Sequence, residues 1–565
     1  MAERNYKGLD KRFVQVVEEG DKLFAERRDV DILFQELAEN FYPERADFTA
    51  TNANISGKFA SNLDTSYPIT ARRDLGNAFG AMLRPPGKEW FTLGIKRDQG
   101  IDEDARKWLE MATRTQRRAI YDREANFVRA TKEGDHDFAT FGQCVLSSEK
   151  AVSPYTGPFL LHRCWHLRDV VWDENSYGKI GCVHRRWQPG ARELANYFKG
   201  KVHPEVEKCA EKEPFKTFEV RHIVLESQDY EKKFRQPYVS IYIDVDNGYV
   251  LEEVGSWNCI YVIPRWETVS GSQYAFSPAT IAALPDARLI QAMTYTLLTV
   301  GEFAADPALV GVTEAIKGAV EAFPGGFTAV DAAYDERLGE VIRPLVKGGE
   351  QAVPQTMKMV QDIRAMISEA FYLSKLAMPP AGQGGMSQYE VSQRIEEFIR
   401  QALPLFEPME TDYNGALMEL DFDILLRNGA FGPVQNIPES LRGQETEFKF
   451  ESPLRDSVER MKGQKFNEAL ALTSQTAQVD PMAIRMVDWR VAQRDALRGI
   501  GTPAAWMVDD KVLDQQEQQM QQQQAQMQQM QAIGGVAQVA EQAGKAGSAI
   551  KEALAPVEQP TQAGV

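Results

Sequence analysis

Two Cys-x-His pairs are the residues of this chain best suited to chemistry. Cys164-Trp-His166 and Cys182-Val-His184 supply two thiols and two imidazoles, which together form the ligand set of a tetrahedral zinc site. We expect the pairs on neighbouring strands, because residues i and i+2 of a strand share a face. The spacing of a zinc finger is absent, however, and His162 extends the alternation of one strand face. We therefore favour half-buried strand residues over a metal site.

Other motifs of catalysis are missing from the sequence. The Gly-Lys pairs that begin at Gly57, Gly87 and Gly544 lack the earlier glycine and the hydroxyl residue of a P-loop. No Gly-x-Ser-x-Gly elbow, His-Glu-x-x-His motif or dinucleotide fingerprint occurs. The sequence thus predicts a protein that is not an enzyme and that uses no cofactor and no metal.

Length and charge narrow the class of protein further. A chain of 565 residues is expected to form about two to four domains with a large core. A net charge of −17 argues against wrapping nucleic acid by phosphate neutralisation, although DNA can pass a surface that does not grip it. No apolar run is long enough to span a bilayer, so we expect no membrane contact. Five cysteines, an odd number, indicate a reducing compartment.

Helical periodicity is strongest between Pro285 and Leu403, where we expect two long helices separated by an insert. Pro285 and Pro307 bracket the first helix. The second helix runs from about Pro354 to Leu376 and has two apolar seams, which form a wider stripe than a helix on its own domain needs. We therefore expect neighbours on both of its sides. The apolar residues are Leu289, Met293, Leu297, Val300 and Ala304 in the first helix, Val360, Ile363, Ile367 and Ala370 on one seam of the second, and Met359, Met366 and Leu373 on the other.

A loop rich in proline and glycine follows the second helix, from Ala377 to Met386. Its two prolines block a continued helix, and its three glycines free the backbone. Ser387 and Glu390 then form a capping box that starts a third helix. We predict a mobile loop held between two firmly specified helix ends. A plain surface connection in an α-rich domain is the alternative.

The part before these helices changes from helical to β-rich sequence. Helical patterns cover residues 8–40 and 68–83, and short apolar runs with turns between them extend from 138 to about 266. We interpret the second part as antiparallel strands in a barrel-like module. A basic helix is expected over residues 103–134, and a solvated face or ion pairs between subunits is favoured there over contact with a polyanion.

The insert and the C-terminal part carry weaker signals. Residues 307–353 are punctuated by glycine and proline, which indicates a small α/β knob. A helix is expected over about 454–474. Of the eighteen residues from 514 to 531, twelve are glutamine. Either this segment is disordered, or it is a polar helix whose narrow apolar seam assembles around a ring axis, which we favour.

Several short pieces, taken in order, resemble portal proteins, the head-to-tail connectors of short-tailed tailed bacteriophages. The resemblance extends to about Gln515, and it is the order and spacing of the pieces that make it specific. Cys144 and the glutamine-dense tail depart from the pattern. The matching pieces are Leu75 to Leu83 with Pro85-Pro86, Trp90 to Leu93, Phe138 to Gly142, Pro264 to Trp266, Tyr274 to Pro278, Leu284 to Asp286, Met386 to Val391, Ser452 to Leu454, and Asp480-Pro481 leading to Val487-Asp488.

This resemblance implies an α+β fold, predominantly α, built as the subunit of a portal ring. It assigns the stem packing to Leu289, Met293, Leu297, Val300, Val360, Ile363, Ile367 and Phe371, and the channel loop to Pro379, Pro380, Gly382, Gln383, Gly384, Gly385 and Met386. The implied parts are a wing (1–276), a first stem helix (277–306), a clip (307–353), a second stem helix (354–376), the channel loop (377–387), a wing helix and return (388–450), crown helices (451–513), and a barrel-like helix with a disordered tail (514–565).

The same resemblance implies the assembly and its partners. The expected protein is a homo-oligomeric ring, typically of twelve subunits, at one capsid vertex of the virion, assembled in the bacterial host cytoplasm. Double-stranded DNA passes through it during genome packaging and ejection. Its expected partners are the terminase large subunit, the tail adaptor, and the scaffolding and major capsid proteins. The alternative is another virion structural protein, an internal core or tail-tube component, that assembles through its C-terminal coiled-coil-like helix.

Overall fold

The computed structural model describes the larger part of the chain, in two units: Met1–Gln99 with Leu109–Met461, and Gly100–Trp108 with Lys462–Val565. The described residues are 9–49, 63–85, 87, 89–96, 103–153, 157–305, 309–311, 316–317, 329–330, 342–344, 349–373, 409–450, 453–477, 487–499 and single positions or short runs between 502 and 523.

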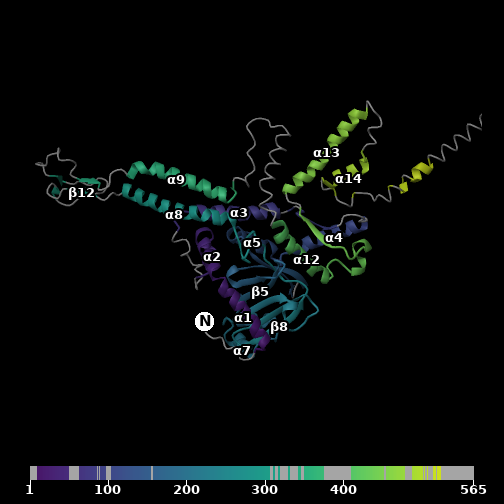
Figure 1. Ribbon diagram of the computed structural model, residues 1–565, viewed down its shortest axis with the longest axis horizontal. Helices are drawn as coiled ribbons and strands as arrows, with labels where there is room; N and C mark the ends of the chain where they lie inside the picture. The colour runs from purple at the N-terminus through teal and green to yellow at the C-terminus, as the bar shows by residue number, and fades with distance from the viewer. Residues whose placement is uncertain are drawn as a thin grey trace, which may run out of the picture. The chain divides into compact units, whose positions relative to one another are not determined.

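An antiparallel sheet of five strands forms the β-rich part of the first unit (Figure 1). Helix α1 (Lys11–Glu26) covers one face, where Val17 packs on Ile223 and Ile241. Two short helices cover the other face, where Leu194 packs with Val220 and Tyr242. The strands, in their order across the sheet, are β4 (Val170–Glu174), β5 (Ile180–Trp187), β6 (Val220–Glu226), β7 (Tyr238–Asp244) and β8 (Tyr249–Ser256), and the two short helices are α6 (Ala191–Phe198) and α7 (Pro204–Lys212).

The predicted strands are therefore present, but the predicted barrel-like module is wrong. The five-stranded sheet is open, with β4 and β8 at its edges. Helices bury both faces of the sheet. Closing the sheet into a barrel would therefore bury no further apolar face. A second, smaller sheet lies in the order β3 (Gly157–Trp165), β2 (Val145–Ser153), β9 (Tyr261–Val262).

Helix α5 (Phe127–Phe141) is the centre of the helical layer that packs on this smaller sheet. Helix α3 (Tyr67–Leu83) lies close along α5 because Gly76 has no side chain: a Cβ at that position would lie 2.3 Å from His136 Nδ1. Helix α2 (Arg28–Phe41) completes the layer. The core between these helices is aromatic and consists of Phe34, Phe41, Phe79, Phe138 and Phe141.

Two long helices, α8 (Pro278–Ala305) and α9 (Gly349–Ala370), lie side by side (Figure 1). The predicted start of the first helix at Pro285 is wrong, since Pro285 lies inside α8. Side-chain hydrogen bonds fix the extra turns: Ser277 Oγ donates to the Ala139 carbonyl at 2.8 Å, and Thr280 Oγ1 donates to the Thr140 carbonyl at 2.7 Å. Because these bonds anchor α8 on α5, the helix tolerates the loss of the one backbone hydrogen bond that a proline removes.

Helix α9 also begins before its predicted start, because Pro354 lies within it. The described residues of the insert between the two helices are strands. They form two antiparallel pairs, β12 (Leu309–Gly311) with β15 (Ile342–Pro344) and β13 (Ile316–Lys317) with β14 (Ala329–Val330).

Segments far apart in the sequence complete the first unit. Strand β1 (Phe91–Ile95) pairs with β16 (Thr446–Phe450), and helix α12 (Ala416–Arg427) packs on β2. Helix α13 (Pro453–Ala477) continues into the second unit, in which Phe466 contacts Trp489 of α14 (Trp489–Gly499) at 6.0 Å between ring centroids. Among the described residues, no helix is long and apolar enough to cross a membrane.

Candidate functional site

The two Cys-x-His pairs do not come together as a metal site. Cys164 lies on β3 and Cys182 on β5, in different sheets, so the expectation of neighbouring strands is wrong. The Cys182 sulfur lies 3.2 Å from His184 Nε2. Burial, helped by the charge of Arg221, lowers the pKa of His184 to about 3 and keeps its ring neutral. The part of the chain that the structure describes contains no group of three His, Cys, Asp or Glu residues that could hold a metal ion.

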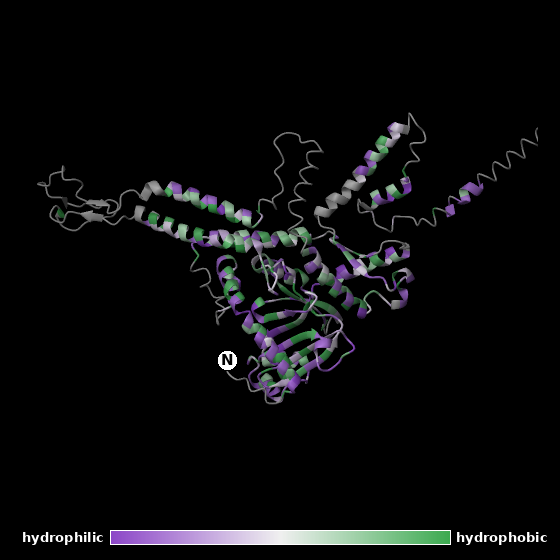
Figure 2. Cartoon of the chain, viewed as in Figure 1, coloured by the Kyte–Doolittle hydropathy of each residue, from purple (hydrophilic) through white to green (hydrophobic). Residues whose placement is uncertain are grey.

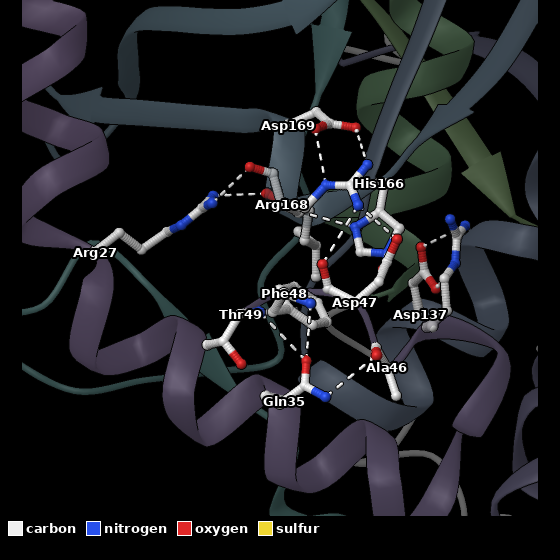
Figure 3. Close-up of polar contacts among 12 residues, drawn as sticks. Arg27, Gln35, Ala46, Asp47, Phe48, Thr49, Asp137, His166, Arg168 and Asp169 are labelled. Carbon is white, nitrogen blue, oxygen red and sulfur yellow. Dashed lines mark hydrogen bonds and ion pairs between the residues drawn. The ribbon is translucent and has the colours of Figure 1, made fainter. Parts of the chain in front are cut away.

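His166 instead belongs to an ion-pair cluster around Asp47 (Figure 3). His166 Nε2 lies 2.6 Å from one oxygen of Asp47, and Arg168 Nη1 lies 2.5 Å from the other. Burial alone would raise the pKa of Asp47, but the hydrogen bond from His166 and the charges of His166 and Arg168 outweigh it and lower the pKa. Asp47 is thus held as a carboxylate. The cluster has a structural role, because it holds Asp47 against the segment that contains His166 and Arg168.

Two further side chains in Figure 3, those of Gln35 and Arg27, make hydrogen bonds in the same region. Gln35 of α2 uses its whole amide: Oε1 accepts from the Phe48 backbone N–H at 2.9 Å, and Nε2 donates to the Ala46 carbonyl at 3.2 Å. Arg27 donates to the backbone carbonyls of Leu167, Arg168 and Val170, at 2.6 Å and 2.8 Å for the first two. The Arg27 bonds connect the end of α1 to the start of β4, and the Gln35 bonds connect α2 to residues 46–48.

The two apolar seams predicted for α9 differ in burial: its predicted stem-packing residues are buried, and the adjacent methionine seam is exposed. Val360, Ile363, Ile367 and Phe371 are all buried within their own chain. On the adjacent seam, by contrast, Met359 is 55% and Met366 is 46% exposed. Figure 2 shows hydrophobic residues recurring along both long helices. The chain therefore covers only one of the two apolar seams of α9.

The apolar residues of α8 are covered even less. Leu289 is exposed, and Met293, Leu297 and Val300 are partly buried. The residues of α8 that are buried inside the unit lie nearer the start of the helix: Ala283, Leu284, Ala287 and Ile290. The large side chains of Tyr295 and Leu298 are also exposed. The predicted seam of α8 thus exists as an apolar face, but one chain alone leaves it open.

Polar anchors, which the sequence reasoning missed, hold the base of α8. Gln291 Oε1 accepts from the backbone N–H groups of Asp64 and Thr65 at 2.8 and 3.0 Å, and its Nε2 donates to the Thr65 carbonyl at 3.0 Å. Arg288 forms an ion pair with Glu36 of α2. The sequence signals these anchors only by a single Gln and a single Arg within an apolar helix. Neither residue indicates which distant residue it contacts.

The prediction of a single basic helix over residues 103–134 is wrong, because the structure has two helices there, α4 (Glu103–Ile120) and α5, with a turn between them. Several cations of α4 are paired. Arg114 pairs with Glu110 at 2.5 Å, and Arg117 pairs with Glu89 at 2.9 Å. These ion pairs agree with the predicted solvated face rather than with a site for a polyanion. The predicted channel-loop residues Pro379, Pro380, Gly382, Gln383, Gly384, Gly385 and Met386 lie outside the described residues.

The described part of the chain thus combines a helical layer, an open five-stranded sheet and a long helix pair with one apolar seam left exposed. The sequence matches the family described as "Bacteriophage head to tail connecting protein" over residues 16–508. The chain therefore belongs to this family of phage head-to-tail connectors, whose members are structural proteins of the virion. The resemblance stated from the short sequence pieces is confirmed.

Comparison with curated proteins finds no match. Among solved structures, the chain is similar to one titled "Virion of native gene transfer agent (GTA) particle". The sequences are 10% identical, the TM-score is 0.34, and the alignment covers 74% of this chain and 89% of the other.

Proposed function

We propose that this connector is a portal subunit, which forms a ring at one capsid vertex and lets double-stranded DNA pass during packaging and ejection. The observation that carries the proposal is the uncovered apolar seam of α9, where Met359 and Met366 stay exposed beside a fully buried seam. Burying a large apolar side chain stabilises an assembly by roughly 1.5–3 kcal/mol. Neighbouring copies, placed head to tail around an axis, cover such faces in every subunit at once.

The acidic composition suits a channel through which DNA must move without binding tightly to the wall. Each phosphate that a protein neutralises adds salt-dependent affinity, which slows the movement of DNA. A net charge of −17 opposes such binding. The absence of a P-loop in the sequence agrees with a passive channel that is driven by a separate ATPase. On the same proposal, residues 377–387 form the loop that follows the moving DNA.

The insert between the stem helices is the proposed docking part for the terminase and the tail adaptor. Its described strands form short antiparallel pairs at the far ends of α8 and α9, which suits a small independent module. Deleting residues 307–353 tests this assignment. The variant should still form rings but lose binding to both partners, and a variant that keeps both interactions contradicts the docking role.

Negative-stain electron microscopy of the purified protein tests the ring itself. The expected particle is a closed ring with a pore on its axis, typically of twelve subunits. A protein that stays monomeric at every concentration and salt level contradicts the proposal. The alternative is an internal core or tail-tube component. The family match is to a head-to-tail connecting protein and does not favour this alternative.

A further inference from the structure

A cavity of about 230 Å³ opens between α3 and α5. The buried side chains of Arg84 and Asp135 form its floor, and the rim includes Tyr121, Val128 and Lys132. The hollow exists because α3 presents Gly80 at this point, where a Cβ would lie 3.2 Å from Asp135 Oδ2. The cavity is too small for most cofactors but fits one apolar side chain.

The charges on the floor of this cavity are already balanced. Arg84 pairs with Asp135, and its Nη1 donates to Asn414 Oδ1 at 2.6 Å. Burial alone would lower the pKa of Arg84, but the Asp135 charge outweighs burial and raises it, so the guanidinium stays protonated. A ligand that enters the cavity therefore meets a fixed, neutralised floor rather than a free cation.

The rim, by contrast, combines exposed apolar surface with free positive charge. Val128 is 60% exposed and Tyr121 is 40% exposed. Lys132 lines the opening. Within the described part of the chain, Lys132 makes no ion pair, whereas Arg129 of the same helix pairs with Glu133. The mouth of the cavity therefore carries a free cation on a chain whose net charge is −17.

We propose that this cavity, with the rim of Tyr121, Val128 and Lys132, docks an acidic peptide segment of a partner protein. One apolar side chain of the peptide fills the cavity, and a flanking carboxylate faces Lys132. Buried anchors in small pockets carry much of the binding energy in such contacts, and rim charges set the choice of partner. A DNA duplex is disfavoured because it has no side chain to enter a hollow of this size.

The probe for this site is a fluorescein-labelled peptide in which Glu residues flank a central Leu-Phe pair, measured by anisotropy with the full-length protein. Two control peptides replace either Glu by Lys or Leu-Phe by Ser-Ser. We expect the acidic peptide to bind at least about tenfold more tightly than either control. Because Trp90 Nε1 donates to the Tyr121 hydroxyl at 2.9 Å, binding should also shift the Trp fluorescence.

Two substitutions on the rim locate the binding. Lys132→Glu and Val128→Glu should each weaken the acidic peptide about tenfold or more, and Lys208→Glu in α7 is the matched charge control, which should bind like the wild type. Both rim residues are exposed or line the opening, so the variants should fold, which circular dichroism checks. Equal binding of all three peptides, or no loss in Lys132→Glu, overturns the proposal. So does a Lys132-dependent binding of duplex DNA, or self-association that Val128→Glu abolishes.

Discussion

The Phe371 ring at the end of α9 packs against the Phe41 ring at the end of α2, with centroids 5.4 Å apart. Both side chains are fully buried, so this contact fastens α9 to the N-terminal helical layer. We predict that Phe371→Ala lowers the free energy of unfolding by about 3–5 kcal/mol, because it leaves a cavity in an aromatic core. Urea denaturation measures the change. Phe371→Leu should lose much less, and an equal loss in both variants contradicts cavity formation as the cause.

The close approach of α3 to α5 depends on a missing side chain. Gly76→Ala should destabilise the protein by about 1–3 kcal/mol, since the new Cβ would overlap the His136 ring, which Arg72 Nη1 contacts at 3.1 Å. Gly301→Ala in α8 is the control, because nothing lies within 4 Å of its Cβ position. There alanine should stabilise the helix by about 0.5–1 kcal/mol. Thermal unfolding of the two variants should therefore shift in opposite directions, and a shared direction refutes this account.

Stability should also depend on pH through His162. Its Nδ1 must donate to the Ala125 carbonyl at 3.1 Å, and its Nε2 lies 3.0 Å from both Asp421 oxygens. Burial alone would lower the pKa of His162, but the Asp421 charge and the hydrogen bonds outweigh it and raise the pKa. A raised pKa stabilises the fold fully below the ordinary value of 6.5, and that stability is lost as pH rises through the folded value.

The measurement is urea denaturation between pH 6 and pH 9 for the wild type and for His162→Gln. Across this range the wild type should lose more stability, or gain less, than the variant. The lowered pKa values of His136 and His184 make both proteins gain stability as pH rises through the ordinary value of 6.5, so the difference between the two proteins isolates His162. Identical pH slopes for the two proteins contradict an ion pair between His162 and Asp421.

The proposed channel loop allows a test in assembly. Pro379→Ala combined with Gly384→Ala removes one helix-blocking residue and one free backbone position. We expect DNA packaging to decrease in a packaging assay while the ring persists in electron micrographs. Unchanged packaging would mean that residues 377–387 have no part in DNA movement. Loss of the ring would mean that they are needed for assembly instead.

The sequence was sufficient where a repeated pattern decides the structure. The spacing of Val360, Ile363 and Ile367 predicted the buried seam of α9, because a helix places these residues on one face. Pro285 misled the prediction of α8, because hydrogen bonds from Ser277 and Thr280 to α5 lie outside any local pattern. The Gln291 anchor and the pairing of β1 with β16 depend on residues more than two hundred positions apart, and no periodicity reports such a partner.

The most direct test of the proposed ring compares two variants of α9 with the same change in net charge. Met359→Glu with Met366→Glu places charge on the exposed apolar seam, and Lys358→Glu places it on the neighbouring polar face. Native mass spectrometry and negative-stain images report the oligomeric state. The account predicts that the double methionine variant is folded but monomeric and that Lys358→Glu forms rings like the wild type. Rings of unchanged size and yield from the methionine variant would contradict the claim that copies of this chain cover that seam.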